Sequence, residues 1–166
     1  MLLPEDLVLT MTEFKGLGCE CSEPRADAES LEYGAHTFEV NGRKAAFRIA
    51  RTTPKKAGQF VTLWQRTTPD GGGPIRPFDS SDGVDLFVIS VRGVGGLGLF
   101  VFPQDALIAR GAVSSGFVGG KRAIRVYLPD SEPTNKTAQS AQRWQLEHYF
   151  PVPDPSGAVA GILARS

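Results

Sequence analysis

Residues 35–51 read AHTFEVNGRKAAFRIAR, and this stretch carries the local signal that decides the fold. Its centre is Asn41-Gly42, a pair that tolerates positive φ at both positions of a two-residue turn. In the second half, Ala45, Phe47 and Ile49 recur at every other position, which places them on one face of a strand. The stretch therefore predicts an antiparallel hairpin.

The sequence on either side of the hairpin predicts further strands and helices. We expect helices over residues 4–15, 104–110 and 134–150, and strands over 60–64, 84–91, 97–102 and 123–128. Residues 84–91 are almost continuously apolar, which indicates a central strand buried on both faces. Residues 19–30 fit a polar loop, and a second short helix over 24–32 is the alternative. This order of elements favours an α+β fold with a mixed sheet and hairpins flanked by helices.

The length of 166 residues predicts one domain, and 41% apolar with 22% charged residues is a globular composition. We expect this domain over residues 1–150 and a loosely held tail over 151–166, because the tail opens with the proline-rich run PVPDP. No run approaches the ~18 apolar residues that a membrane span needs. Glu5 and Asp6 stand where a signal peptide carries basic residues, so we expect a cytoplasmic protein without a membrane partner.

Charge is distributed unevenly along the chain, although the formal net charge is zero. Residues 1–32 contain eight acids and two bases, whereas residues 41–66 contain seven bases and no acid. Residues 106–129 form a second stretch without acids and add four bases. Two interpretations stay open: the acidic stretch folds over the basic ones and neutralises them, or the cations stay free for an anionic partner.

The segment from Arg48 to Arg66 combines cations with hydroxyl and amide side chains, the types that bind phosphate groups. We expect Phe60 and Trp64 of the same segment to lie in the core. Together with the second acid-free stretch, this segment supplies nine candidate phosphate-binding residues: Arg48, Arg51, Thr53, Lys55, Lys56, Gln59, Lys121, Arg122 and Arg125.

The common cofactor-binding and catalytic motifs are either absent or lack the flanking structure that they require. Residues 93–98 match G-x-G-x-x-G, but a strand pattern follows where a dinucleotide site needs a helix, so we interpret them as a turn. Cys19 and Cys21 are separated by one residue, which is too close for the usual zinc spacing, and two cysteines cannot build a disulfide scaffold. A serine nucleophile elbow, G-x-S-x-G, does not occur. We expect no cofactor and no structural metal.

A metal-dependent nuclease remains an alternative. Such enzymes hold a magnesium ion with two carboxylates and place a lysine near the attacking water. Glu39 and Asp85 are the candidate carboxylates, and magnesium is expected only in this case. The triplet Ile49-Ala50-Arg51 stands where a second acid and the lysine are needed, and arginine keeps the charge but cannot act as a base.

Several longer motifs resemble the MepB family over about residues 30–150. They are Tyr33-Gly34-Ala35, residues 47–51, 53–56, 58–64 and Arg66, then Pro74-Ile75, residues 77–79, Asp85, Val91-Arg92 and residues 100–103, 120–122, 125–127 and 142–145. The resemblance implies a small bacterial protein without a firmly assigned activity. It also implies a likeness to the restriction-endonuclease-like fold, and hence nucleic-acid binding. Members of the family often have lysine in place of Arg51, and some have an acid in place of Ile49, so cleavage is not implied for this chain.

The sequence leaves the oligomeric state open, but it favours one kind of partner. We expect a protein that binds nucleic acid through its phosphates and catalyses no reaction. One alternative is the degenerate nuclease described above. The other is an accessory factor that binds a protein or a small molecule, with Arg48 and Arg51 holding a carboxylate or a nucleotide phosphate.

Overall fold

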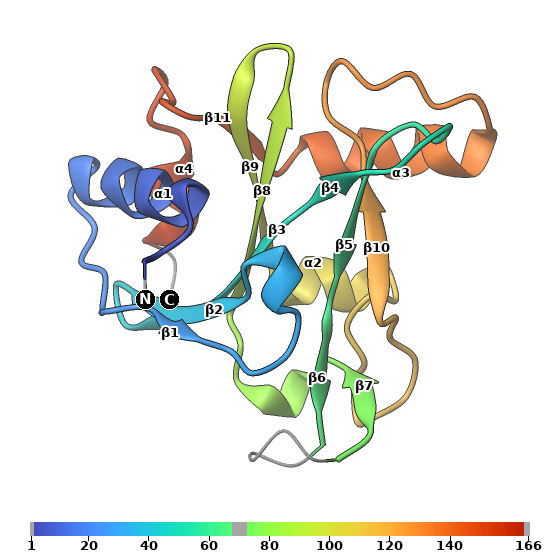
Figure 1. Cartoon of the computed structure of the whole chain (residues 1–166), viewed down its shortest axis with the longest axis horizontal. Helices are drawn as coiled ribbons and strands as arrows, with labels where there is room; N and C mark the ends of the chain where they lie inside the picture. Colours follow the sequence, from blue (N-terminus) through green and yellow to red (C-terminus); the bar gives the residue numbers. More distant parts are fainter. Residues whose placement is uncertain (1, 68–72, 165–166) are drawn as a thin grey trace.

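A computed structural model describes residues 2–67 and 73–164, and its centre is a mixed sheet of six strands (Figure 1). In spatial order the strands are β1 (Arg25–Ala26), β2 (His36–Val40), β3 (Arg43–Ile49), β8 (Leu86–Gly93), β9 (Gly96–Pro103) and β11 (Tyr149–Pro151). β3 and β8 run parallel, and the other neighbouring pairs are antiparallel. The predicted hairpin is confirmed as β2 and β3, and both Asn41 and Gly42 have positive φ.

One face of this sheet is covered by α1 (Glu5–Gly16) and α4 (Val159–Leu163), at the left of Figure 1. The apolar residues of α1 recur at helical spacing, so Leu7, Met11 and Phe14 all point at the sheet and are buried. They form a first hydrophobic core with the inward residues of β2, β3, β8 and β9.

The opposite face of the sheet carries a second core. It packs against a three-stranded sheet with the order β10 (Ala123–Val126), β5 (Gln59–Thr62) and β4 (Arg51–Thr52), and against α2 (Gln104–Ala109) and α3 (Lys136–Leu146). The strands β6 (Trp64–Arg66) and β7 (Ile75–Pro77) pair with each other, and η1 (Leu31–Tyr33) and η2 (Ser80–Asp82) are short 3-10 helices.

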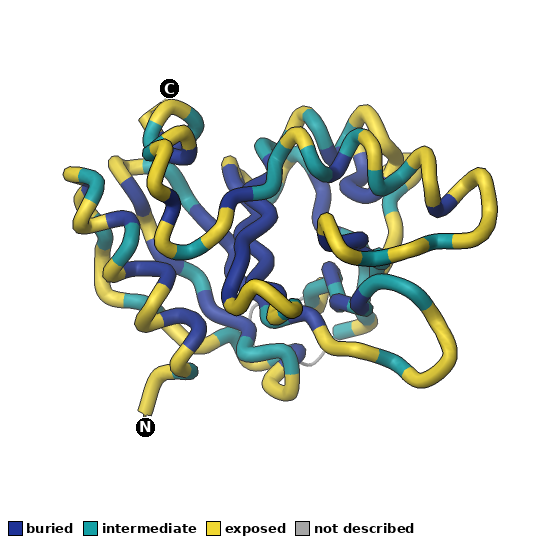
Figure 2. The backbone as a smooth tube through the Cα atoms, turned by 90° about the horizontal axis from the view of Figure 1, so that it is seen from above, coloured by how far each residue is buried: buried dark blue, intermediate teal, exposed yellow. Residues whose placement is uncertain are grey.

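The central strand β8 separates the two cores. Leu86 and Val88 point into the first core, whereas Phe87 and Ile89 point into the second. This alternation confirms the prediction that residues 84–91 are buried on both faces, and Figure 2 shows the strands at the middle of the molecule buried along most of their length. The predicted α+β class with a mixed sheet is confirmed.

The C-terminal part differs from the prediction. The helix expected over 134–150 ends at Leu146, and β11 then joins the edge of the main sheet beside β9. The expectation of a loosely held tail is wrong for residues 151–164, because Val159 and Leu163 are buried in the first core. The guanidinium of Arg43 also donates a hydrogen bond to the carbonyl oxygen of Ile162 at 2.6 Å.

Other local predictions are corrected as well. Residues 24–32 contain β1 and the start of η1, so the alternative of a short helix is wrong. Phe60 and Trp64 are half-buried rather than core residues, because Phe60 lies beside Tyr33 at the margin of the second sheet. The glycine- and proline-rich composition of residues 67–77 also predicts a turn, but residues 68–72 of this segment lie outside the described residues. Over the described residues, none of the helices has the length and apolar character to span a bilayer.

Candidate functional site

Two adjoining cavities open between α3 and the edge of the three-stranded sheet. Their volumes are about 740 and 320 Å³. They share the lining residues Arg125, Tyr127, Asn135 and Ala138, so they form one continuous depression. We call the two cavities together the basic groove.

The charge of the basic groove is of one sign. Among the described residues, neither cavity is lined by an aspartate or a glutamate. Six cations line them: Lys55, Lys56, Arg110, Lys121, Arg125 and Lys136. They come from three separate parts of the chain, which the fold brings to one place. A hollow lined by one sign of charge concentrates the field and attracts ions of the opposite sign.

Arg125 organises the side of the groove formed by the second sheet. It lies on β10, and its guanidinium donates hydrogen bonds to the Ala57 carbonyl at 3.1 Å and to the Thr53 hydroxyl. These bonds fix the loop over residues 53–58, which carries the exposed Lys55 and Lys56. The Thr53 hydroxyl thus accepts a hydrogen bond from Arg125, and Thr53 itself lines neither cavity of the groove.

Gly58 allows this loop to pack closely on β10. A Cβ at this position would lie 2.7 Å from the Tyr127 ring and 2.7 Å from the Val126 carbonyl oxygen. Gly58 also has a φ of +77°, which side-chain-bearing residues rarely adopt. The position of the two lysines beside the groove thus depends on a glycine.

The other wall is the first turn of α3. Asn135 caps this helix, since its Oδ1 accepts a hydrogen bond from the Ala138 amide at 2.8 Å. The first turn contains no acid and begins with Lys136. A cation at the positive end of a helix dipole is unfavourable for the helix itself, so this residue does not serve helix stability.

Gln145 connects α3 to the floor of the groove. It is buried, and its side chain accepts from the Tyr127 amide at 2.8 Å and donates to the Arg125 carbonyl at 2.9 Å. The preceding residue, Trp144, lines the larger cavity, and the Arg110 guanidinium lies 5.1 Å from the centre of the Trp144 ring. The groove is therefore held by specific contacts between α3 and β10.

Arg48 does not belong to an open site, which corrects its prediction as a phosphate-binding residue. Its side chain is fully buried beneath the second sheet, 3.1 Å from a carboxylate oxygen of Asp27, and its guanidinium lies 5.5 Å from the Phe78 ring centre. Burial lowers the pKa of Arg48, and the charge of Asp27 opposes that shift. Arginine stays charged in proteins, so Arg48 is a buried ion pair.

The remaining candidates are divided between two places. Arg51 and Gln59 line a separate cavity of about 400 Å³ beside Arg92, on the other side of the three-stranded sheet's edge strand β4. Gln59 is buried and donates to the Arg92 carbonyl oxygen at 2.8 Å. Arg122 is exposed but lines neither cavity of the groove. Of the nine candidates, four line the groove: Lys55, Lys56, Lys121 and Arg125.

Acids of the N-terminal stretch pair with cations elsewhere in the chain, as the first of the two charge interpretations expects. The acidic N-terminal stretch neutralises two cations, because Asp27 pairs with Arg48 and Asp6 pairs with Arg92 at 2.7 Å. Its helix α1 does not cover the groove, because α1 packs on the face of the main sheet opposite to α3. The four lysines of the groove are exposed, whereas the Arg125 guanidinium is hydrogen-bonded to Ala57 and Thr53 and the Arg110 guanidinium lies over the Trp144 ring.

The two carboxylates of the nuclease alternative flank Lys44 at one end of the main sheet. Glu39 is opposite Lys44 across the β2–β3 pair, and the Oδ2 of Asp85 accepts a hydrogen bond from the Lys44 amide at 3.0 Å. Neither acid lines the basic groove. Within residues 2–67 and 73–164, no group of three or more His, Cys, Asp or Glu side chains is placed to hold a metal ion.

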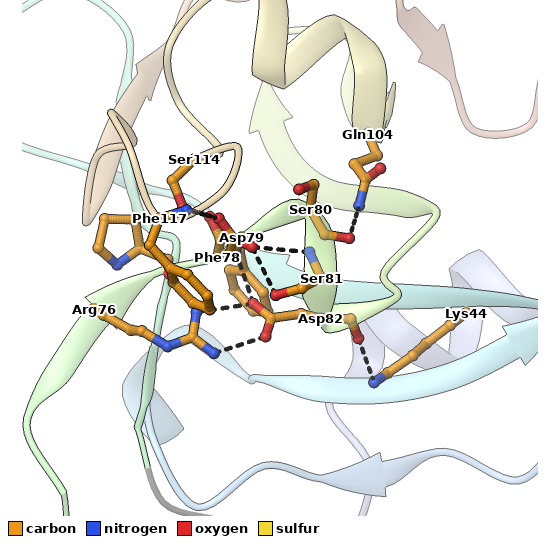
Figure 3. A network of polar contacts seen from close by, with 11 residues as sticks. Lys44, Arg76, Phe78, Asp79, Ser80, Ser81, Asp82, Gln104, Ser114 and Phe117 are labelled. Carbon is orange, nitrogen blue, oxygen red and sulfur yellow. Dashed lines mark hydrogen bonds and ion pairs between the residues drawn. The ribbon is translucent and has the colours of Figure 1, made fainter.

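A polar network surrounds Asp79 (Figure 3). The buried Asp79 carboxylate accepts hydrogen bonds from the Ser114 hydroxyl and the Phe117 amide, both at 2.7 Å, and from the amide and hydroxyl of Ser81. These bonds, first those of the Ser81 and Ser114 hydroxyls, hold the pKa of Asp79 far below its ordinary value. Asp82 beside it accepts two hydrogen bonds from Arg76, at 2.7 and 3.0 Å.

Sequence reasoning missed two of the groove cations. Arg110 belongs to the second acid-free stretch but has no local pattern that marks it as a ligand. Lys136 had a usable signal, because it follows the capping residue Asn135 in a first helical turn that contains no acid.

Comparison with known proteins identifies relatives by sequence and by fold. The MepB-like family model matches residues 27–151. The crystal structure of MepB is similar to this chain with 27% identity and a TM-score of 0.73, over 89% of this chain and 97% of that chain. No curated protein is similar to this chain in sequence.

A second solved structure supports the expected fold. The structure of a bacterial homing endonuclease is 18% identical, with a TM-score of 0.50, over 84% of this chain and 86% of that one. That likeness concerns the fold alone, and it fits the restriction-endonuclease-like fold implied by the sequence motifs. Because the family model spans three quarters of the residues and MepB matches along nearly its whole length, the chain belongs to the MepB-like family.

Proposed function

We propose that this protein binds nucleic acid through the phosphate backbone, in the basic groove, without catalysing a reaction. The observation that carries the proposal is the meeting of six cations from three chain segments in one depression without an acid. Lysine and arginine side chains supply most of the attraction to phosphates, and they position a strand without reading its bases.

The details of the groove support an anionic ligand. Lys55, Lys56, Lys121 and Lys136 are exposed, and no hydrogen bond or ion pair of their side chains to a described residue is found. Lys136 also stands at the positive end of α3, where a bound anion would interact favourably with both the lysine and the helix dipole. An extended polyanion can contact both cavities, since they share four lining residues.

A nuclease receives less support than a binding protein. The candidate acids Glu39 and Asp85 lie outside the groove, and Arg51 cannot act as the base that the lysine of such a site supplies. A small anionic ligand is a second candidate, because the larger cavity of about 740 Å³ has a volume typical of small-molecule sites.

The test is a titration of the protein with fluorescent single-stranded and double-stranded oligonucleotides at two ionic strengths. We expect binding at low salt that weakens steeply at high salt, because phosphate contacts release counterions. Absence of binding at low salt, or binding without salt dependence, would contradict the proposal. A thermal-shift experiment with mononucleotides and oligonucleotides separates the candidates, since stabilisation by mononucleotides alone would favour the small ligand.

A further inference from the structure

A tight turn beside the groove presents an aromatic ring to solvent. Ser115 and Val118 exchange two backbone hydrogen bonds of 3.1 Å, and the turn between them consists of Gly116 and Phe117. The Phe117 side chain is 65% exposed. Much of the Phe117 ring surface is therefore accessible to a ligand.

The backbone of Phe117 is unusual for its residue type. Gly116 and Phe117 have φ values of +58° and +62°, the arrangement of a type I′ turn. Glycine, asparagine and aspartate normally occupy such positions, and a bulky side chain with positive φ is an outlier. The conformation is therefore imposed by the surroundings.

A hydrogen bond to a buried carboxylate imposes this backbone conformation on Phe117. The Phe117 amide donates to Asp79 at 2.7 Å, and the same Asp79 oxygen accepts the Ser114 hydroxyl at 2.7 Å (Figure 3). On the ring itself, the Arg76 guanidinium lies 5.4 Å from the ring centre, and Arg76 is fixed by its two hydrogen bonds to Asp82. The guanidinium thus lies over the ring, and we call this pair the Phe117–Arg76 platform.

The loop that carries the platform starts and ends in the groove. The Lys121 amide donates to the Ala112 carbonyl at 2.9 Å, which closes the loop at its base. Both Ala112 and Lys121 line the larger cavity. Phe117 is four residues from Lys121, so the Cα atoms of the two residues are at most ~14 Å apart. A strand with a phosphate at Lys121 thus reaches the platform within a few nucleotides.

We propose that the Phe117–Arg76 platform stacks an unpaired base of a single strand whose phosphates occupy the basic groove. This inference rests on the proposed function and names its substrate class, single-stranded nucleic acid. Every base has a π-face that stacks on an aromatic ring without sequence preference, and a neighbouring arginine adds a cation–π contribution. In a duplex the bases are paired and stacked on each other, so they are not offered to such a platform.

The test compares an intact single strand of about 12 nucleotides with a strand of the same length that lacks bases in its central part. Both carry the same phosphates, so the ratio of their dissociation constants measures base stacking. We expect the wild-type protein to prefer the intact strand by about tenfold. Phe117→Ala removes this preference without changing the salt dependence, and Phe117→Trp retains it.

Two further variants make the result specific. Phe117→Asn also removes the ring but suits the left-handed backbone, so it reports on stacking even if Phe117→Ala unfolds. Val94→Ala removes another exposed apolar side chain, at the β8–β9 turn, and is expected to keep the preference.

The outcomes separate the two proposals. If the Phe117 variants prefer the intact strand as the wild type does, while loss of groove lysines weakens both strands, the platform is wrong and the groove stands. Equal binding of both strands by the wild type also overturns the platform. If the wild type binds neither strand at low salt, the proposed function fails and the platform fails with it.

Discussion

Removal of Lys55 and Lys56 together gives a quantitative test of the groove. Both side chains are exposed and line the smaller cavity, so Lys55→Ala with Lys56→Ala removes charge without removing core contacts. Lys55 has a φ of +65°, and alanine bears that backbone strain much as lysine does. We therefore expect the free energy of unfolding to change by less than ~0.5 kcal/mol.

The expected effect on binding follows from the number of cations. If each of the six groove cations contacts one phosphate of a single strand, log K falls with log salt with a slope of about −4. The double variant keeps four cations, which gives a slope of about −3. Between about 50 and 200 mM salt, the wild type then loses ~300-fold in affinity and the variant ~50-fold.

The assay is fluorescence anisotropy at four salt concentrations with two strands of different sequence. Phosphate contacts carry no base information, so both sequences should weaken alike. The matched control is Lys15→Ala with Arg25→Ala, which removes two exposed cations outside the groove. The reasoning is refuted if the groove variant keeps the wild-type slope, if the control lowers the slope equally, or if only one sequence is affected.

Three further predictions concern the framework of the site. Arg48→Ala lowers the free energy of unfolding, measured by urea denaturation, by about 3 to 5 kcal/mol, because it leaves the charge of Asp27 without its partner; a change below ~1 kcal/mol would contradict the buried pair. Gly58→Ala destabilises the fold by about 2 kcal/mol and weakens binding, because its Cβ meets the Tyr127 ring; unchanged thermal melting would argue against the close packing. Because the pKa of Asp79 is lowered in the folded state, the ionised carboxylate stabilises the fold at every pH above the ordinary pKa of aspartate. This contribution is lost as the pH falls from that ordinary pKa toward the folded-state pKa. Asp79→Asn should therefore be less stable than the wild type at pH 7, with a difference that narrows in urea melts toward pH 3, and a constant difference would count against it.

Local patterns in the sequence predict the strands but not what covers them. Asn41-Gly42 and the apolar run of β8 act through near neighbours, so the hairpin and the central strand are as expected. Arg48 illustrates the limit. Its alternation with Phe47 correctly places it on the other face of β3, but that face is covered by the second sheet, whose strand β10 comes from far along the chain. Strand period tells which residues share a face, and only tertiary packing tells whether that face meets water.

The candidate site shows the same limit from the opposite side. Lys55, Lys56, Lys121 and Arg125 lie in acid-free stretches, which predicts them as phosphate-binding residues, and the fold brings them to one groove. Arg51 is only a few residues from Lys55, yet it lines a different cavity because β4 pairs on one side of β5 and β10 on the other. Two residues that are close in sequence, such as Arg51 and Lys55, can therefore belong to different sites when one of them lies on a short edge strand.

The zero net charge of the chain is compatible with binding a polyanion because the charges are separated in space. Three of the eight acids of the N-terminal stretch, Glu5, Asp6 and Glu13, lie on α1, which packs on one face of the main sheet, and the groove cations lie beside α3 on the other. Where that stretch does meet cations, at Arg48 and Arg92, the pairs stabilise contacts between elements and are withdrawn from binding. Arg48 and Arg92 are therefore not available to bind a polyanion. A polyanion that approaches from the α3 side meets the positive potential of the groove cations, which the zero net charge of the chain does not reveal.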